Sequence, residues 1–293
     1  MRSEIQKAGI FFIQLLIAGS LITACNSAKK PQTVIKDSVV VKSTTVTSAE
    51  PLRAANDSIV TITNPTGEKV MNTLYGTYDA KAKTSAWLCH NAGKLLKFKT
   101  GLNAKFLSQL LFADSVTTKG KKQFYVIISA RPEGDDFMCH ACAPVEEVFI
   151  FEKETTAWRL TYRKMFDDIG SYGLAPEFKL KKAGTDSYVF LVETGDMDQG
   201  ISAQSVFIYS YYQGEFKSVL KLQDVGMDNT GACDDKVAGS CWDYNYTLTF
   251  ANTPGNYNDI KLTKKGTEDK NGKTVPVDTV MNYQFAGGNY VSK

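Results

Sequence analysis

The nine residues WDYNYTLTF, at positions 242–250, decide the fold class. Large apolar side chains alternate there with polar ones, so every second side chain lies on the same face of an extended strand. This period of two predicts a strand of an antiparallel sheet that packs one face against a core. The residues of the apolar face are Trp242, Tyr244, Tyr246, Leu248 and Phe250.

The same period, or a short continuous apolar run, recurs along most of the chain. Turn signals such as Gly184-Thr185-Asp186 and Asn271-Gly272 separate the segments. The continuous runs YVFLV and VFIY predict central strands that are covered on both faces. Strands at such short spacing predict a mainly β protein of antiparallel sheets, propeller-like or a sandwich. The other predicted strands are residues 124–130, 146–152, 158–162, 176–182, 187–194, 205–212 and 215–222.

One stretch departs from the period of two. In LNAKFLSQLLFAD, residues 102–114, apolar side chains recur at helical spacing, and Thr100 could cap the first turn. We therefore expect one short helix near residues 102–113. Its apolar stripe would be Leu102, Phe106, Leu107, Leu110 and Leu111.

From about residue 176 onward, strands alternate with acidic loops in a rhythm that resembles the four-stranded blades of β-propellers. The segment YVFLVETGDMDQG at 188–200 and the ending YQFAGGNYV at 283–291 carry this resemblance. It covers less than half of the chain and has no strict repeat. A propeller-like curved sheet and a sandwich therefore both stay open.

The N-terminus has the organisation of an export signal. Arg2 and Lys7 are followed by the apolar segment AGIFFIQLLIAGSLI, residues 8–22. Its 15 residues are fewer than the roughly 20 that a membrane-spanning helix needs. We expect residues 1–24 to be a signal peptide.

The end of this segment, LITAC, resembles the lipobox of bacterial lipoproteins. Ile22, Thr23 and Ala24 stand before Cys25 as that motif requires. The resemblance implies cleavage before Cys25 and its lipidation with acyl chains such as palmitate, which anchor stably because each buried methylene contributes about 0.8 kcal/mol. Asn26 replaces the aspartate that holds enterobacterial lipoproteins at the inner membrane. The resemblance thus implies the outer membrane, with the protein facing the periplasm.

Residues 26–57 contain no aromatic side chain and are rich in serine, threonine, lysine and alanine. This composition predicts a flexible tether with a typical span of about 30 Å. Within it, TVIKDSVVVKSTTV at 33–46 has strand propensity and could pair with the body. Residues 58–293 are numerous enough for a sizeable core, and we expect them to form a single β-rich domain.

The charge balance is close to neutral. The formal charge of +3 becomes +2 without residues 1–24, because these contain two basic residues and one acidic residue. The lysine pairs are scattered, and no basic stripe of the kind that binds nucleic acid is present. The expected partners are the membrane, through the lipid, and a protein, peptide or glycan ligand.

Both histidines of the chain directly follow a cysteine, in LCHN at 88–91 and MCHAC at 138–142. Disulfides are the default for cysteines of an exported protein. Cys233 and Cys241, eight residues apart in a Gly- and Asp-rich loop, are one candidate pair. Cys139 and Cys142 are a second, and a bond from Cys89 to either of these is an alternative.

The same cysteines and histidines could instead hold Zn or Cu(I). Adjacent side chains of a strand point to opposite faces, which disfavours two ligands at successive positions. A redox dithiol is a third interpretation, but Pro144 and a predicted strand follow where a helix would be needed. The motif CHACAP resembles one in uncharacterised bacterial exported proteins, which implies no activity. The metal candidates are Cys89, His90, Cys139, His140 and Cys142.

The loop GDMDQG, residues 195–200, places Asp196 and Asp198 at the spacing of the first half of a calcium loop. The third acidic position and the distal glutamate are missing, so a solvated turn is the alternative interpretation.

No motif of a metalloprotease, serine hydrolase or P-loop nucleotidase occurs in the chain. We therefore assign no catalytic residue and no resident cofactor. The sequence predicts a lipid-anchored envelope protein whose body is a binding or structural module. The alternatives are an envelope protein that binds Zn or Cu and a thiol-disulfide redox protein.

Overall fold

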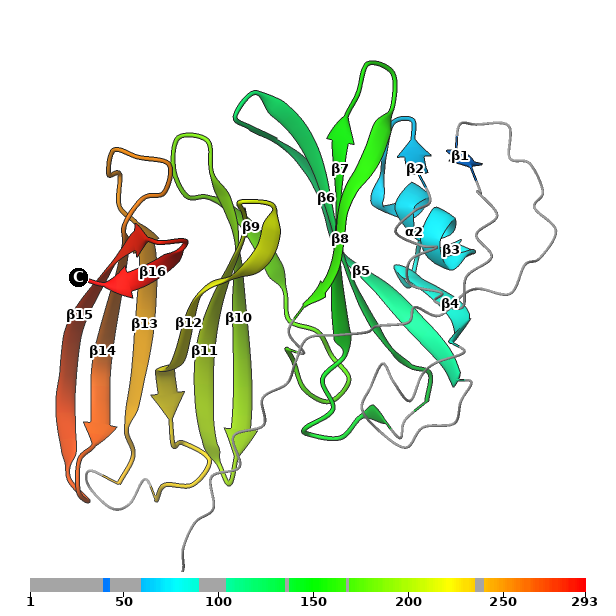
Figure 1. Ribbon diagram of the computed structural model, residues 1–293. Helices are drawn as coiled ribbons and strands as arrows, with labels where there is room; N and C mark the ends of the chain where they lie inside the picture. Colours follow the sequence, from blue (N-terminus) through cyan, green and yellow to red (C-terminus); the bar gives the residue numbers. More distant parts are fainter. Residues whose placement is uncertain (1–38, 43–58, 90–103, 135–136, 167–168, 235–239) are drawn as a thin grey trace, which may run out of the picture.

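The computed structural model describes residues 39–42, 59–89, 104–134, 137–166, 169–234 and 240–293. They form two eight-stranded antiparallel sheets and one short helix (Figure 1). The predicted mainly β class is thereby confirmed. Among these residues, no helix is long and apolar enough to cross a membrane.

The first sheet contains the N-terminal half of the described chain, and the second contains the C-terminal half. In spatial order, the first sheet consists of β1 (Val39–Lys42), β2 (Ile59–Ile62), β8 (Trp158–Phe166), β7 (Val145–Lys153), β6 (Lys121–Pro132), β5 (Ala104–Thr118), β4 (Thr84–Cys89) and β3 (Tyr78–Asp79). The second consists of β9 (Phe178–Lys182), β10 (Tyr188–Asp198), β11 (Ile201–Tyr212), β12 (Glu215–Asp228), β13 (Asp243–Phe250), β14 (Ile260–Asp269), β15 (Thr274–Ala286) and β16 (Asn289–Ser292).

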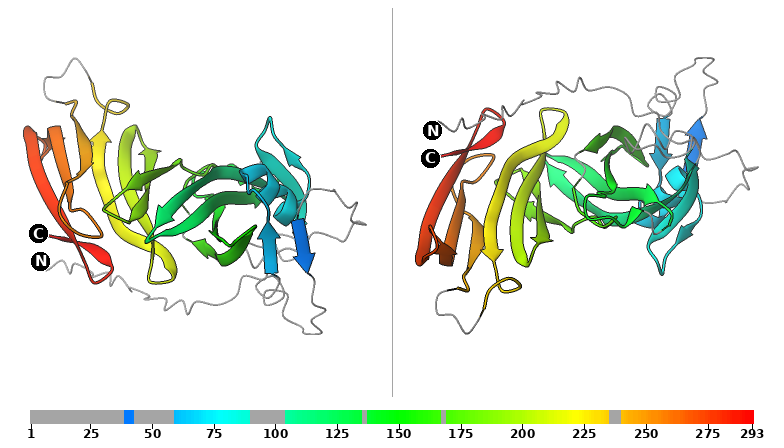
Figure 2. Two further views of the ribbon diagram at one scale, coloured as in Figure 1. Left: turned by 90° about the horizontal axis from the view of Figure 1, so that it is seen from above. Right: turned by 90° about the horizontal axis from the view of Figure 1, so that it is seen from below.

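The second sheet is a meander in chain order rather than a row of four-stranded blades. It curls, and β16 turns back towards β12, as both views in Figure 2 show. At this closing end the ring of Tyr212 lies 5.3 Å from that of Phe285. The described residues thus form two packed antiparallel sheets, of which the second is curled, and they contain no repeated four-stranded blade.

The helix α2 (Gly67–Tyr75) begins at Thr66, whose side chain accepts a hydrogen bond from the Lys69 amide at 3.2 Å. It ends at Gly76, whose φ of +90° suits glycine. Val70, Met71 and Tyr75 are buried against one face of the first sheet.

The helix expected near residues 102–113 is wrong. Residues 104–118 form β5, which pairs with β4 and β6, whereas residues 102–103 and Thr100 lie outside the described residues. The register shifts between Leu110 and Phe112. Leu110 therefore packs towards α2 and Leu111 towards the second sheet. A strand covered on both faces, with a bulge in it, imitates the apolar spacing of a helix.

The core consists of stacked layers. One cluster fills the space between α2 and the first sheet, a second joins the two sheets, and a third lies within the curl of the second sheet. In β10, Phe190 and Val192 face the first sheet, whereas Val189 and Leu191 face the curl. The prediction that YVFLV is covered on both faces is thus confirmed.

Part of the segment 33–46, for which the sequence indicates strand propensity, is a strand in the structure. Val39–Lys42 pairs with Ile59–Ile62 and forms an edge of the first sheet. The described portion of the predicted tether is therefore bound to the body.

Candidate functional site

Both predicted disulfides are present. Cys139 is bonded to Cys142, and Cys233 is bonded to Cys241. Disulfides of this kind form and persist in an oxidising compartment, so the protein belongs outside the cytoplasm.

The CHAC turn, residues 139–142, lies in the segment that connects β6 to β7. It also binds the segment that leads from the first sheet to the second. Within the turn, the amide of Cys142 donates to the carbonyl oxygen of Cys139 at 2.9 Å. The amide of Tyr172 donates to the same oxygen at 3.0 Å, and that of Gly173 donates to the carbonyl oxygen of Cys142 at 2.7 Å. The turn at 171–174, which precedes the second sheet, is thereby fixed on the CHAC turn.

The turn at 171–174 is tight. Ser171 and Leu174 form a bridge, and the residues between them, Tyr172 and Gly173, have φ values of 53° and 68°. Two positive φ values at the centre define a primed turn, which normally prefers asparagine and glycine. The tyrosine in this unfavourable position presents its ring to His140, with the centroids 5.3 Å apart.

His140 reaches across to the second sheet. Its Nε2 lies 2.6 Å from Oδ1 of Asp196 on β10. The same carboxylate oxygen accepts the Met197 amide at 2.9 Å. Two residues that the sequence assigned to different hypothetical metal sites thus meet in one hydrogen bond.

The predicted Zn or Cu ligands are not brought together within the described part of the chain. The sulfurs of Cys139 and Cys142 are bonded to each other, and the His140 imidazole is engaged by Asp196. The side chain of Cys89 and the whole of His90 lie outside the described residues. Among the residues described, no group of three histidine, cysteine, aspartate or glutamate side chains could hold a metal ion, and this includes Asp196 and Asp198.

Exposed apolar side chains precede the CHAC turn in the chain and lie on the turn at 171–174 that is bound to it. Met138, Tyr172 and Leu174 are 38%, 44% and 58% exposed. These three residues, with the His140–Asp196 pair, are termed the CHAC surface below. Apolar side chains grouped around a rigid turn are typical of sites that bind another macromolecule.

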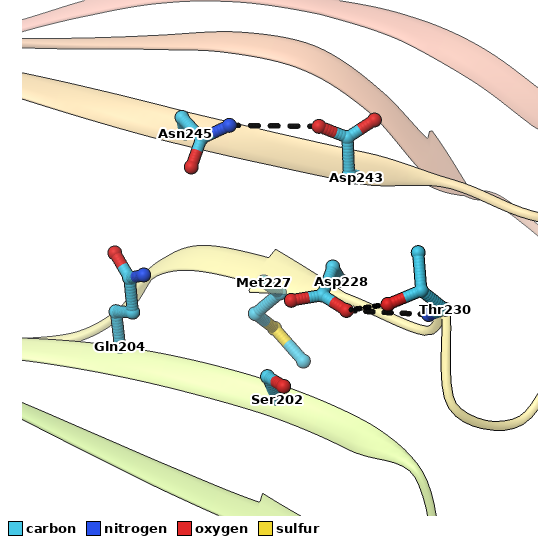
Figure 3. A pocket seen from close by; sticks show the side chains of 7 residues that line it. All are labelled: Ser202, Gln204, Met227, Asp228, Thr230, Asp243 and Asn245. Atoms are coloured by element: carbon cyan, nitrogen blue, oxygen red, sulfur yellow. Dashed lines mark hydrogen bonds between the residues drawn. The ribbon is translucent and has the colours of Figure 1, made fainter.

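A second feature is a hollow of about 280 Å³ where β11, β12 and β13 meet (Figure 3). It lies beside the loop that Cys233–Cys241 closes. Asn229 spans that loop: its Nδ2 donates to the Ser240 carbonyl at 2.8 Å, and its Oδ1 accepts the Trp242 amide at 2.7 Å. The lining residues are Ser202, Gln204, Met227, Asp228, Thr230, Asp243 and Asn245.

Two carboxylates face each other at this hollow, because Asp228 and Asp243 are register partners of β12 and β13. The hydroxyl of Thr230 donates to Asp228 at 2.6 Å and holds the pKa of that carboxyl below its usual value. Asp228 is therefore ionised at neutral pH. With its mixture of carboxylates, amides and hydroxyls, the hollow can donate to and accept from a small polar ligand.

Sequence reasoning did not identify this hollow. Asp243 and Asn245 occupy the polar face of the stretch WDYNYTLTF, which the alternation marks as the face away from the core. Ser202 and Gln204 approach them only through the pairing of β11 with β12, and polar residues of separate strands give no joint signal in a sequence.

No family model, no curated protein and no solved structure matches this chain. The assignment of a function therefore depends on the geometry described above.

Proposed function

We propose that this is a lipid-anchored protein of the cell envelope whose β body is a binding module. It docks another envelope polypeptide on the CHAC surface. The single observation that carries the binding role is the grouping of exposed Met138, Tyr172 and Leu174 at two turns, one closed by a disulfide and the other fixed to it by two backbone hydrogen bonds.

Rigidity matters here because a preordered surface loses little conformational entropy when a partner binds. The ring of Tyr172 offers a large amphipathic contact, and the adjacent His140–Asp196 pair offers polar groups at its rim. Apolar anchors surrounded by a polar rim are the usual composition of a protein interface.

The anchoring role rests on Cys25 and the lipobox-like residues before it. The oxidising compartment that the two disulfides indicate agrees with an exported protein. We assign the protein to the outer membrane because asparagine rather than aspartate follows Cys25. We further propose that it faces the periplasm.

The anchor is tested by metabolic labelling of the full chain with a palmitate analogue, followed by fractionation. The chain is expected to carry label and to sediment with the outer membrane, whereas Cys25→Ser is expected to lose label and cleavage. Equal labelling of both forms would refute lipidation at Cys25.

The docking surface is tested with a photo-crosslinking residue placed at Leu174 and, as a matched control, at Val280. Both positions are exposed and apolar, at 58% and 49%, but Val280 lies on β15 of the second sheet. Adducts with an envelope polypeptide are expected from position 174 and should fall at least tenfold in Tyr172→Ser. Equal adducts from both positions, or none from either, would refute the proposal.

A further inference from the structure

We propose that the Cys139–Cys142 disulfide exchanges with a pair of cysteine thiols on the polypeptide that docks at the CHAC surface. This inference rests on the proposed function and names the chemistry of its partner. The partner is a polypeptide that presents a dithiol.

The two cysteines of this disulfide differ in exposure. Cys139 is an exposed residue, whereas Cys142 is only 5% exposed. Cys142 packs in a small cluster with Phe106, Phe137 and Val145. An incoming thiolate can therefore reach the sulfur of Cys139, and the sulfur of Cys142 becomes the leaving group.

The surroundings of the turn preserve its shape when the bond opens. Tyr172 and Gly173 donate to the carbonyl oxygens of Cys139 and Cys142, and His140 binds Asp196 on the other sheet. None of these contacts uses a sulfur atom. The two cysteines therefore stay close after reduction, which makes the bond easy to close again.

The exchange is balanced in atoms and electrons. A partner thiolate attacks Sγ of Cys139, the Cys139–Cys142 bond breaks, and Cys142 leaves with the electron pair and takes a proton from water. The second partner thiolate then attacks the partner sulfur of the mixed disulfide and releases Cys139, which is also protonated. The partner leaves with a disulfide, and the CHAC turn has gained two electrons and two protons.

The chain contains its own control in Cys233–Cys241. Both of these cysteines are half-buried, they close a longer loop, and none of the exposed apolar residues of the CHAC surface lies beside them in the sequence. A general sensitivity to reductant would open both bonds together, whereas an exchange site opens Cys139–Cys142 selectively.

The first test is a titration of the full mature chain with reduced and oxidised glutathione, followed by alkylation and mass mapping. Cys139 and Cys142 are expected to become labelled at a reduced-to-oxidised ratio at least tenfold lower than Cys233 and Cys241. If both pairs open at the same ratio, or if Cys233–Cys241 opens first, the inference is overturned.

The second test compares two single substitutions in cells. Cys142→Ser leaves the exposed thiol of Cys139 and is expected to form a reducible mixed disulfide. Cys139→Ser leaves the buried thiol of Cys142 and is expected to form at least tenfold less. Equal yields would overturn the inference.

Failure of this inference is distinguishable from failure of the proposed function. Photo-adducts at Leu174 without a mixed disulfide at Cys139 would retain the docking surface and overturn the exchange. Absence of both would overturn the docking surface as well.

Discussion

The helix α2 is joined to the first sheet by a hydrogen bond from Tyr75 to a partly buried ion pair of that sheet. Nε of Arg163 lies 2.5 Å from a carboxylate oxygen of Glu147, whose other oxygen accepts the hydroxyl of Tyr75 at 2.7 Å. Burial and the neighbouring Glu147 carboxylate raise the pKa of Tyr75 well above its ordinary value, so this phenol remains a donor at all physiological pH values.

We expect Glu147→Gln to destabilise the protein by about 2–3 kcal/mol, because it leaves the Arg163 guanidinium without its counter-charge in a poorly hydrated site. The measurement is the free energy of unfolding in urea. Glu154→Gln is the matched control. Its pair with Arg159 is about half exposed (51% and 49%), against 13% and 20% for Glu147 and Arg163. The control should lose less than about 0.5 kcal/mol, and equal losses would contradict this account.

The carboxyl group of Glu193 makes the stability of the protein depend on pH. The ammonium of Lys179 at 2.8 Å and, next, the hydroxyl of Tyr246 hold the pKa of this carboxyl below its ordinary value. Because the folded-state pKa is lowered, the stabilisation is present above the unfolded pKa of about 4.3 and is lost as the pH falls through the folded value.

We expect Glu193→Gln to lower the urea midpoint at pH 7 and to flatten its decline between about pH 5 and pH 3. Glu133→Gln, at an exposed position after β6, controls for the removal of one negative charge. A Glu193→Gln profile that runs parallel to the original chain would show that this carboxyl contributes nothing to acid sensitivity.

For single strands, the alternation of apolar and polar residues is enough to predict the structure where one face of the strand is solvated. In β13 the exposed and buried positions follow the predicted order from Asp243 to Phe250. In β5 it failed, because packing on both faces and the bulge near Leu111 are tertiary effects that leave a helix-like spacing in the sequence. The helix α2 went unnoticed since its apolar stripe of Val70, Met71 and Leu74 is short.

The candidate site was predictable to a similar extent. Both disulfide pairs could be predicted from spacing and compartment. The contact between His140 and Asp196 could not, because the two residues are 56 positions apart and lie on different layers. Only the packing of the two sheets brings them together.

The pairing of β12 with β13 places two acidic residues opposite each other. Asp228 and Asp243 are directly opposite each other, and like charges at such positions destabilise a sheet. We expect Asp243→Asn to raise the melting temperature by about 1 °C. Asp278→Asn is the matched control, because Asp278 lies opposite Lys265 and its substitution should leave the melting temperature unchanged or lower. A lower melting temperature for Asp243→Asn would mean that its carboxylate has a stabilising partner.

The molecule as a whole is held together by the cluster between the sheets. Phe190 of the second sheet packs its ring 5.0 Å from Phe112 and 5.7 Å from Tyr125 of the first. Such a shared core predicts that both sheets unfold in a single transition.

This is measured by tryptophan fluorescence in urea. Trp87→Phe with Trp158→Phe leaves Trp242 to report on the second sheet, whereas Trp242→Phe leaves the two tryptophans of the first sheet. The two transitions should coincide. Phe190→Ala should lower the free energy of unfolding measured from either by about 3–5 kcal/mol. Separate midpoints would show two independent domains.

The pairing of β1 with β2 has a consequence for how far the body stands from the bilayer. On the proposal that Cys25 carries lipid, only residues 26–38 separate the acyl chains from the first strand. A segment of that length cannot exceed about 45 Å, whatever its conformation. The first strand is then held within this distance of the leaflet that contains the lipid. A docking partner must therefore belong to the same membrane surface or must diffuse to within that distance of it.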